Sequence, residues 1–127
     1  MAAITATLSS APKLINGSIV RYSGTSTANQ TDTLTSTVVP TGGCHRLCYV
    51  TVSYSATPVQ TGVTIAIDSS LGANFDTTIY TGAANVTDTI YFPDDTLWLL
   101  PGDAIVVTAP AAGGSITSNI VIVLEQG

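Results

Sequence analysis

The segment LCYVTVSYSATPVQTGVTIAID, residues 47–68, contains two runs in which apolar and polar side chains alternate. The even positions of 48–54 are apolar, and the same period of two recurs over 63–67. Because successive side chains of a strand point to opposite faces, each run predicts a strand with one face in a core. Between them, residues 56–62 contain Pro58, which cannot donate a ladder hydrogen bond. We therefore expect an antiparallel hairpin whose apolar face packs on a second sheet.

The composition favours strands over helices along the whole chain. Its 127 residues fit one domain, and only 9% of them are charged, far below the usual quarter. There are 21 threonines and 12 serines, whereas Lys, Glu and Met occur once each. Threonine is β-branched and suits strands, and its hydroxyl keeps an outer face polar. No long window has a helical apolar period, so the sequence predicts an all-β protein.

Short strand candidates recur at roughly 8–12-residue spacing, which is typical of a sandwich. They are residues 4–9, 18–23, 31–39, 47–55, 63–68, 75–80, 86–92, 97–100, 104–109 and 116–124. We expect a single jelly-roll-like β-sandwich of about eight antiparallel strands. Residues 15–127 form this domain, and residues 1–14 form an N-terminal arm or an edge strand. The run 120–124 is apolar without alternation, which predicts a strand buried on both sides.

The charge pattern argues against several classes of partner. The net charge is −5, and the basic residues Lys13, Arg21 and Arg46 form no cluster. Phosphate binding needs a basic footprint, so we expect no nucleic-acid partner. No apolar run approaches 18 residues, so we expect no membrane partner. The N-terminus lacks the basic start and continuous apolar core of a secretory signal, so we expect folding in a cytoplasm.

Cys44 and Cys48 are the two cysteines. On an extended strand their Cα atoms would be about 13 Å apart at ~3.3 Å per residue, whereas a disulfide needs about 7 Å. Either the segment bends and a bridge forms, or the two remain separate thiols, with Cys48 on the apolar face. Cys44, His45 and Cys48 are poor metal ligands as a set, because neighbours 44 and 45 point apart and no second Cys/His pair exists.

The sequence contains no recognisable catalytic set. His45 is the single histidine and no GxSxG elbow accompanies it, so we expect a solvated turn histidine. Glu125 is the single glutamate, which leaves no assignable carboxylate pair for glycoside hydrolysis. The aspartates fall mainly at strand ends and turns, where they bond backbone N–H groups: Asp68, Asp76, Asp88, Asp94, Asp95 and Asp103. Asp94 and Asp95 lack the DxDxDG pattern of a calcium loop. We expect no enzyme activity, metal or cofactor.

Trp98 is the only tryptophan and lies between two leucines. Such a residue is more often part of a core or a subunit contact than a sugar-stacking platform. A carbohydrate-binding module would instead present an exposed aromatic platform around Trp98 or Tyr80.

Two longer runs carry a resemblance to a known group of proteins. VTVSYSATPVQTGVTIAID (50–68) resembles a hairpin of the small all-β accessory proteins in tailed-bacteriophage virions. IYFPDDTLWLLPGDAIVVTAPAAGGSITSNIVIVLE (90–125) is similar to their second half, and the two runs together cover about half the chain. The two cysteines near residues 42–48 depart from that pattern.

The resemblance implies a capsid decoration or cement protein, a β-sandwich or jelly roll that is often a homotrimer. Its implied partner is the major capsid protein, and its implied location is the capsid surface of a virion assembled in the host cytoplasm. Binding only to the assembled lattice would stabilise the shell by mass action. The alternatives are another virion component, in the tail, neck or head fibre, and a carbohydrate-binding jelly-roll module.

Overall fold

The computed structural model describes residues 2–4, 7–10, 19–26, 31–36, 39, 43–58, 62–82, 87–92, 97–111 and 113–126. Its elements are β1 (Ala2–Ile4), β2 (Thr7–Ser10), β3 (Ile19–Ser26), β4 (Asp32–Thr35), β5 (His45–Tyr54), β6 (Val63–Asp68), the 3-10 turn η1 (Ala73–Phe75), β7 (Thr77–Gly82), β8 (Thr87–Tyr91), β9 (Trp98–Leu99), β10 (Ala104–Ala109) and β11 (Ser118–Gln126).

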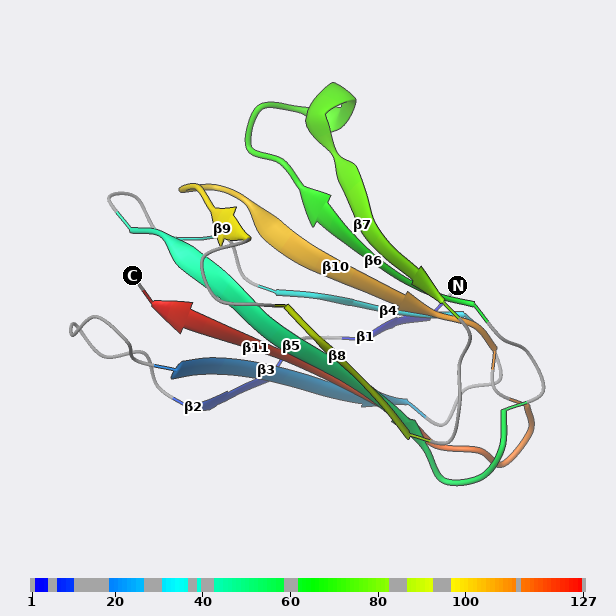
Figure 1. The fold of residues 1–127 in the computed structure, drawn as a ribbon. Helices are drawn as coiled ribbons and strands as arrows, with labels where there is room; N and C mark the ends of the chain where they lie inside the picture. The colour runs from blue at the N-terminus through cyan, green and yellow to red at the C-terminus, as the bar shows by residue number, and fades with distance from the viewer. Residues whose placement is uncertain are drawn as a thin grey trace.

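These strands form two sheets packed face to face (Figure 1). Sheet A has the order β1-β4-β10-β6-β7, and sheet B has the order β2-β3-β11-β5-β8 with β9 also paired to β5. All of these pairs are antiparallel except β1 with β4, which is parallel. The expected all-β sandwich is confirmed, with short additional strands β1, β2 and β9 around the main eight.

Eight of the strands pair in a nested order that defines a jelly roll. β3 pairs with β11, β4 with β10, β5 with β8, and β6 with β7. A long antiparallel ribbon folded over on itself gives this order, because each successive pair is closer in sequence than the one outside it. The predicted jelly-roll-like sandwich is therefore the observed topology.

The predicted hairpin between residues 47–55 and 63–68 is wrong. β5 lies in sheet B, where it pairs with β11, β8 and β9, and β6 lies in sheet A between β10 and β7. Alternation shows which face of a strand is buried, but not which strand lies beside it. The segment between β5 and β6 crosses from one sheet to the other, and the two apolar faces belong to opposite walls of one core.

The core fills the space between the sheets. Its fully buried members include Leu34 and Ile105 from sheet A and Leu47 and Ile122 from sheet B, each with no exposed area. β11 runs between β3 and β5 in the middle of sheet B, and from Ile120 to Leu124 only Val121 is more than slightly exposed. The apolar run thus marks a central strand, in agreement with its sequence pattern.

A β-bulge in β5 displaces Cys48 from the core. Val123 is opposite Tyr49 and Leu124 is opposite Leu47, so Cys48 is an extra residue on β5. A bulge puts two residues of one strand against one of its partner and shifts the alternation. Leu47 is therefore buried and Cys48 only half-buried, which corrects the expectation that Cys48 lies on the apolar face.

The register places particular strand termini together. The starts of β3, β5, β7 and β10 lie at the same end of the sandwich as the ends of β4, β6 and β11. β9 also lies at this end, because Leu99 pairs with His45 at the start of β5. The opposite end holds the segments 55–58 and 113–117, which hydrogen-bond to each other through Ser55 and Thr117.

Candidate interaction surface

Large apolar side chains that remain exposed gather at one end of the sandwich. Among the described residues they are Ile19, Leu71, Phe75, Tyr91, Trp98 and Leu100. Leu71 and Phe75 lie between β6 and β7, and Trp98 and Leu100 lie in and after β9; Ile19 starts β3 on the far side of sheet B, and Tyr91 lies opposite Tyr49. We call the surface formed by Leu71, Phe75, Trp98 and Leu100 the apolar end. Clustered exposed apolar groups mark interaction sites more often than scattered ones do.

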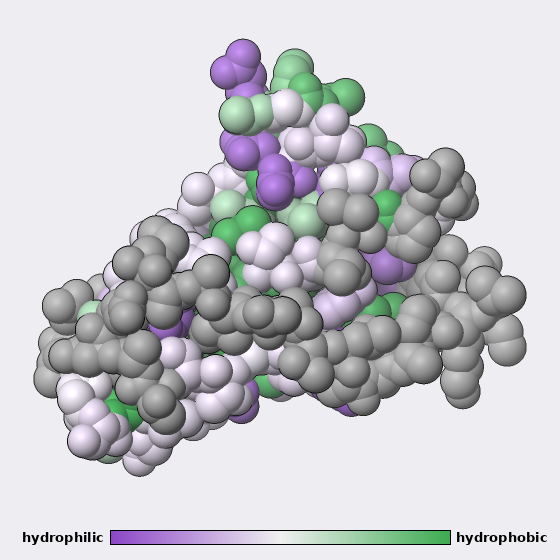
Figure 2. Space-filling model, turned by 180° about the vertical axis from the view of Figure 1, so that it is seen from behind, coloured by the Kyte–Doolittle hydropathy of each residue, from purple (hydrophilic) through white to green (hydrophobic). Residues whose placement is uncertain are grey.

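The segment between β6 and β7, residues 69–76, forms a protruding tip (Figure 1). Leu71 is 67% exposed and Phe75 is 58% exposed. Gly72 adopts φ 113°, a left-handed conformation that glycine tolerates, and η1 follows it directly. In Figure 2, hydrophobic and strongly hydrophilic residues lie side by side on this projection. Sequence reasoning placed a turn at 69–74 and did not single out Leu71 and Phe75, although two large apolar residues around a turn glycine were the available signal of an exposed apolar loop.

The tip is held by hydrogen bonds within it. The Ser69 N–H donates to Asp76 Oδ1 at 2.8 Å, and the Leu71 N–H donates to Ser69 Oγ at 3.1 Å. The Phe75 N–H donates to the Gly72 carbonyl at 3.0 Å. Asp76 and Ser69 therefore shape the loop that carries both apolar side chains.

Asp103 joins the tip to the turn before β10. Its Oδ1 accepts the Ser70 N–H at 2.8 Å, and its Oδ2 accepts the Leu100 N–H at 3.0 Å. Its own backbone N–H donates to the Leu100 carbonyl at 3.0 Å, which closes the turn. For Asp76 and Asp103, the expectation that turn aspartates bond nearby backbone N–H groups is confirmed. Leu100, itself 59% exposed, is held beside the tip by this carboxylate.

Gly102 lets the turn and the tip approach closely. It has φ 88°, and a Cβ placed on it would lie 2.7 Å from Ser70 Cβ. A contact below 3.0 Å forces a shift, so any other residue would push the tip away from the turn. The Pro-Gly-Asp sequence at 101–103 thus has two functions, a tight turn and a contact point for the tip.

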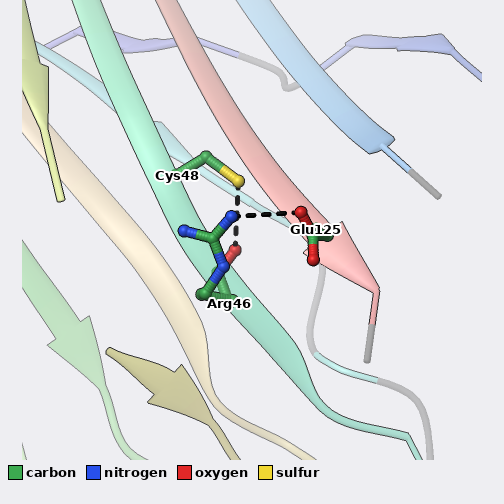
Figure 3. A network of polar contacts seen from close by, with 3 residues as sticks. All are labelled: Arg46, Cys48 and Glu125. Atoms are coloured by element: carbon green, nitrogen blue, oxygen red, sulfur yellow. Dashed lines mark hydrogen bonds and ion pairs between the residues drawn. The ribbon is translucent and has the colours of Figure 1, made fainter. Parts of the chain in front are cut away.

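On sheet B, an ion pair lies beside the apolar end. Glu125 of β11 and Trp98 of β9 are both register partners of Arg46 in β5. The Arg46 Nη2 donates to Glu125 Oε2 at 3.0 Å, and Cys48 Sγ lies 3.7 Å from the Arg46 carbonyl oxygen (Figure 3). The Arg46 side chain is only 10% exposed. Its positive charge is therefore compensated mainly by the Glu125 carboxylate and little by solvent.

His45 is buried, which corrects the expectation of a solvated turn histidine. It is the first residue of β5, it is 3% exposed, and its register partners are Leu99 and Gln126. Neither ring nitrogen has a hydrogen-bond partner among the described residues. Burial lowers the pKa of His45 below its usual 6.5. The expected turn is instead the start of β5, and His45 lies two residues before Leu47, on the same buried face of the strand.

Cys44 and Cys48 are both half-buried thiols, with no disulfide joining them. Of the two alternatives left open by their spacing, the structure has separate thiols. Within the described ranges, no three His, Cys, Asp or Glu side chains gather in a way that could hold a metal ion. Asp94 and Asp95 lie outside the described residues. No described helix is long and apolar enough to cross a membrane.

Of the two aromatic residues around which a carbohydrate-binding module would present a platform, only Trp98 is exposed. Trp98 is 41% exposed, whereas Tyr80 is half-buried on β7 with its ring over Gly82. Tyr49 and Tyr91 pair across β5 and β8, with ring centroids 5.6 Å apart and planes tilted by 49°. Sequence reasoning did not single out this tyrosine pair, because it needs the β5–β8 register.

Comparisons with known proteins support the fold. No protein-family model matches the sequence, and no curated protein does. A chain in the structure of the capsid of Ralstonia phage GP4 is similar with a TM-score of 0.59 and 13% identity, over 99% of each chain. A chain in the acid-stable capsid of Helicobacter pylori bacteriophage KHP30 is similar with a TM-score of 0.55 and 11% identity, over 87% of this chain and 90% of that one.

A chitosan-binding module from a Paenibacillus chitosanase/glucanase matches less well, with a TM-score of 0.47 and 15% identity over 83% of this chain and 75% of that one. At these identities the two capsid comparisons establish the fold alone: this chain has the fold of chains found in phage capsid structures.

Proposed function

We propose that this protein is a capsid decoration protein of a tailed bacteriophage, a non-enzymatic virion component that binds the major capsid protein on the assembled head. The observation that carries the proposal is the similarity, along 99% of both chains, to a chain in the capsid of Ralstonia phage GP4. The match therefore spans nearly all of the sequence described here and nearly all of a chain from a capsid structure.

The surface also suits a protein that acts by contact. Its large exposed apolar residues lie mostly at one end, on turns held by Asp76 and Asp103. The single histidine of the sequence is buried, where a substrate in solution would not reach it. A protein that binds only the assembled lattice stabilises that lattice by mass action, because dissociation of the shell also requires its release. In this proposal the protein is a homotrimer on the capsid surface, assembled in the host cytoplasm.

The test uses heads of the phage that encodes the protein, prepared without it, and the purified protein. We expect the protein to sediment with assembled heads, to raise the temperature at which they release DNA, and not to bind unassembled capsid protein. Analytical ultracentrifugation should give three times the 12.9 kDa chain mass. Failure to bind heads would refute the capsid proposal, and electron microscopy that locates the protein on tails, necks or fibres would replace it with the alternative virion role.

One observation favours a second candidate, a carbohydrate-binding module. Tyr91 is 73% exposed and packs against Tyr49, and Trp98 is partly exposed on the same sheet. Exposed aromatic rings stack on sugar rings, so glycan binding should change the intrinsic fluorescence of Trp98. A panel of soluble glycans that leaves the emission unchanged would eliminate this candidate.

A further inference from the structure

The β6–β7 tip has the properties of a preformed docking element. Leu71 and Phe75 extend from a loop that projects beyond the sandwich (Figure 1), and Figure 2 shows hydrophobic surface on the same projection. Leu100 lies next to the tip, because Asp103 accepts N–H groups from both Ser70 and Leu100. Leu100 therefore lies at the base of the projection that carries Leu71 and Phe75.

The tip is ordered before any partner arrives. Its backbone is bonded to the Asp76 carboxylate and the Ser69 hydroxyl, and its base is bonded to Asp103. Fixing a loop in advance lowers the conformational entropy lost on binding. Exposed apolar side chains on such a loop can enter a pocket at little further cost.

The charge around the tip indicates what kind of surface accepts it. Asp68 and Asp76 are both exposed beside the apolar residues. The whole sequence has only three basic residues, and the Arg46 side chain is largely buried against Glu125. A second copy of this chain therefore has few cations to place against two carboxylates, and an interface that joined tip to tip would bring like charges together. The complementary surface is apolar with a basic rim, on a different protein.

We propose that the β6–β7 tip is the part of this protein that enters the capsid surface, and that Leu71 and Phe75 fill an apolar depression on the major capsid protein rimmed by Lys or Arg. This inference rests on the proposed function. It adds which end of the protein faces the capsid and what kind of capsid surface that end contacts. The opposite end, with the exposed residues Ser55, Ala56 and Thr57, faces away from the shell.

The first test removes the apolar groups. Leu71→Ser/Phe75→Ser should bind heads at least about a hundredfold more weakly than wild type, because each buried anchor contributes about tenfold or more. The matched control Ala56→Ser/Thr57→Ser makes two exposed serines at the opposite end and should bind as wild type does. Circular dichroism and the urea midpoint check that both variants are folded. Tip-variant binding within threefold of wild type would overturn the proposal.

A second measurement uses the wild-type protein and so does not depend on variant folding. Hydrogen exchange of the head-bound protein should show new protection at residues 69–76 and none at 55–58. The reverse pattern would overturn the proposed orientation while leaving capsid binding itself established. A wild type that does not bind heads would refute the proposed function directly, before any question of orientation.

The charge component has its own test. Asp68→Asn removes one exposed carboxylate with almost no change in shape, and it should weaken head binding severalfold and reduce its dependence on salt. Tighter binding by this variant would show that the rim is not basic. If the isolated protein is an oligomer that Leu71→Ser/Phe75→Ser dissociates, the tip is a contact between copies and the proposal is wrong.

Discussion

Replacing Asp103 with alanine tests whether one carboxylate organises the apolar end. Its two oxygens accept the Ser70 and Leu100 N–H groups at 2.8 and 3.0 Å. A hydrogen bond to a charged group contributes about 1.5–3 kcal/mol. Ser70 and Leu100 are exposed, so water can reach their freed N–H groups. We therefore take the lower end of this range for each of the two bonds and expect the free energy of unfolding to fall by about 2–4 kcal/mol. The total free energy of unfolding of a protein of this size is roughly 5–15 kcal/mol.

The assay is urea unfolding followed by circular dichroism, together with hydrogen exchange. Asp103→Asn keeps one acceptor oxygen, so its free energy of unfolding should fall by about 1–2 kcal/mol, half as much as in Asp103→Ala. Asp68→Ala is the matched control, an exposed aspartate at the same end, and should stay within about 0.5 kcal/mol of wild type. The amides of Ser70 and Leu100 should exchange faster in Asp103→Ala. A loss below 0.5 kcal/mol, or unchanged exchange at both amides, would show that the tip is held by other contacts.

Gly102→Ala should destabilise the protein by about 1–3 kcal/mol, because φ is positive and the new Cβ meets Ser70; a thermal midpoint equal to that of wild type would contradict this geometry. Burial lowers the pKa of His45, so the unfolded chain takes up a proton near pH 6.5 that the folded protein resists. The free energy of unfolding should therefore fall as the pH drops from 6.5 toward the folded pKa, and urea titrations should show a weaker fall in His45→Gln; parallel pH profiles would disprove the effect. Glu125→Gln should cost about 1–3 kcal/mol by removing the carboxylate from a mostly buried Arg46, and a double-mutant cycle with Arg46→Met measures the coupling; a coupling near zero would mean that the pair adds no stability.

The candidate surface was only partly visible in the sequence. The turns at 69–74 and 101–103 and the backbone-bonding role of Asp76 and Asp103 followed from glycine, proline and aspartate chemistry. That these two turns touch could not be predicted, because the contact joins residues 33 positions apart through Asp103 and Ser70. The exposure of Leu71 and Phe75 likewise depends on how far the tip projects from the sandwich.

Cys48 and His45 show where a local pattern misleads. A period of two placed Cys48 inside, and one extra residue in β5 moved it out; His45 was expected in a turn, but β5 begins at His45 and buries it. A bulge leaves no mark in the sequence of its own strand, since it is set by the pairing of that strand with β11.

By itself, the sequence determined that the chain builds a two-layered all-β domain. Alternating apolar residues, abundant threonine and regularly spaced turn residues are local properties, and they also identified 120–124 as a central buried strand. Only the tertiary structure decided which strands are neighbours: β5 and β6 separated into opposite sheets, and the apolar end was assembled from β9, the tip and the turn before β10. The reason is that alternation specifies a face, whereas strand pairing is settled by long-range packing of every strand at once.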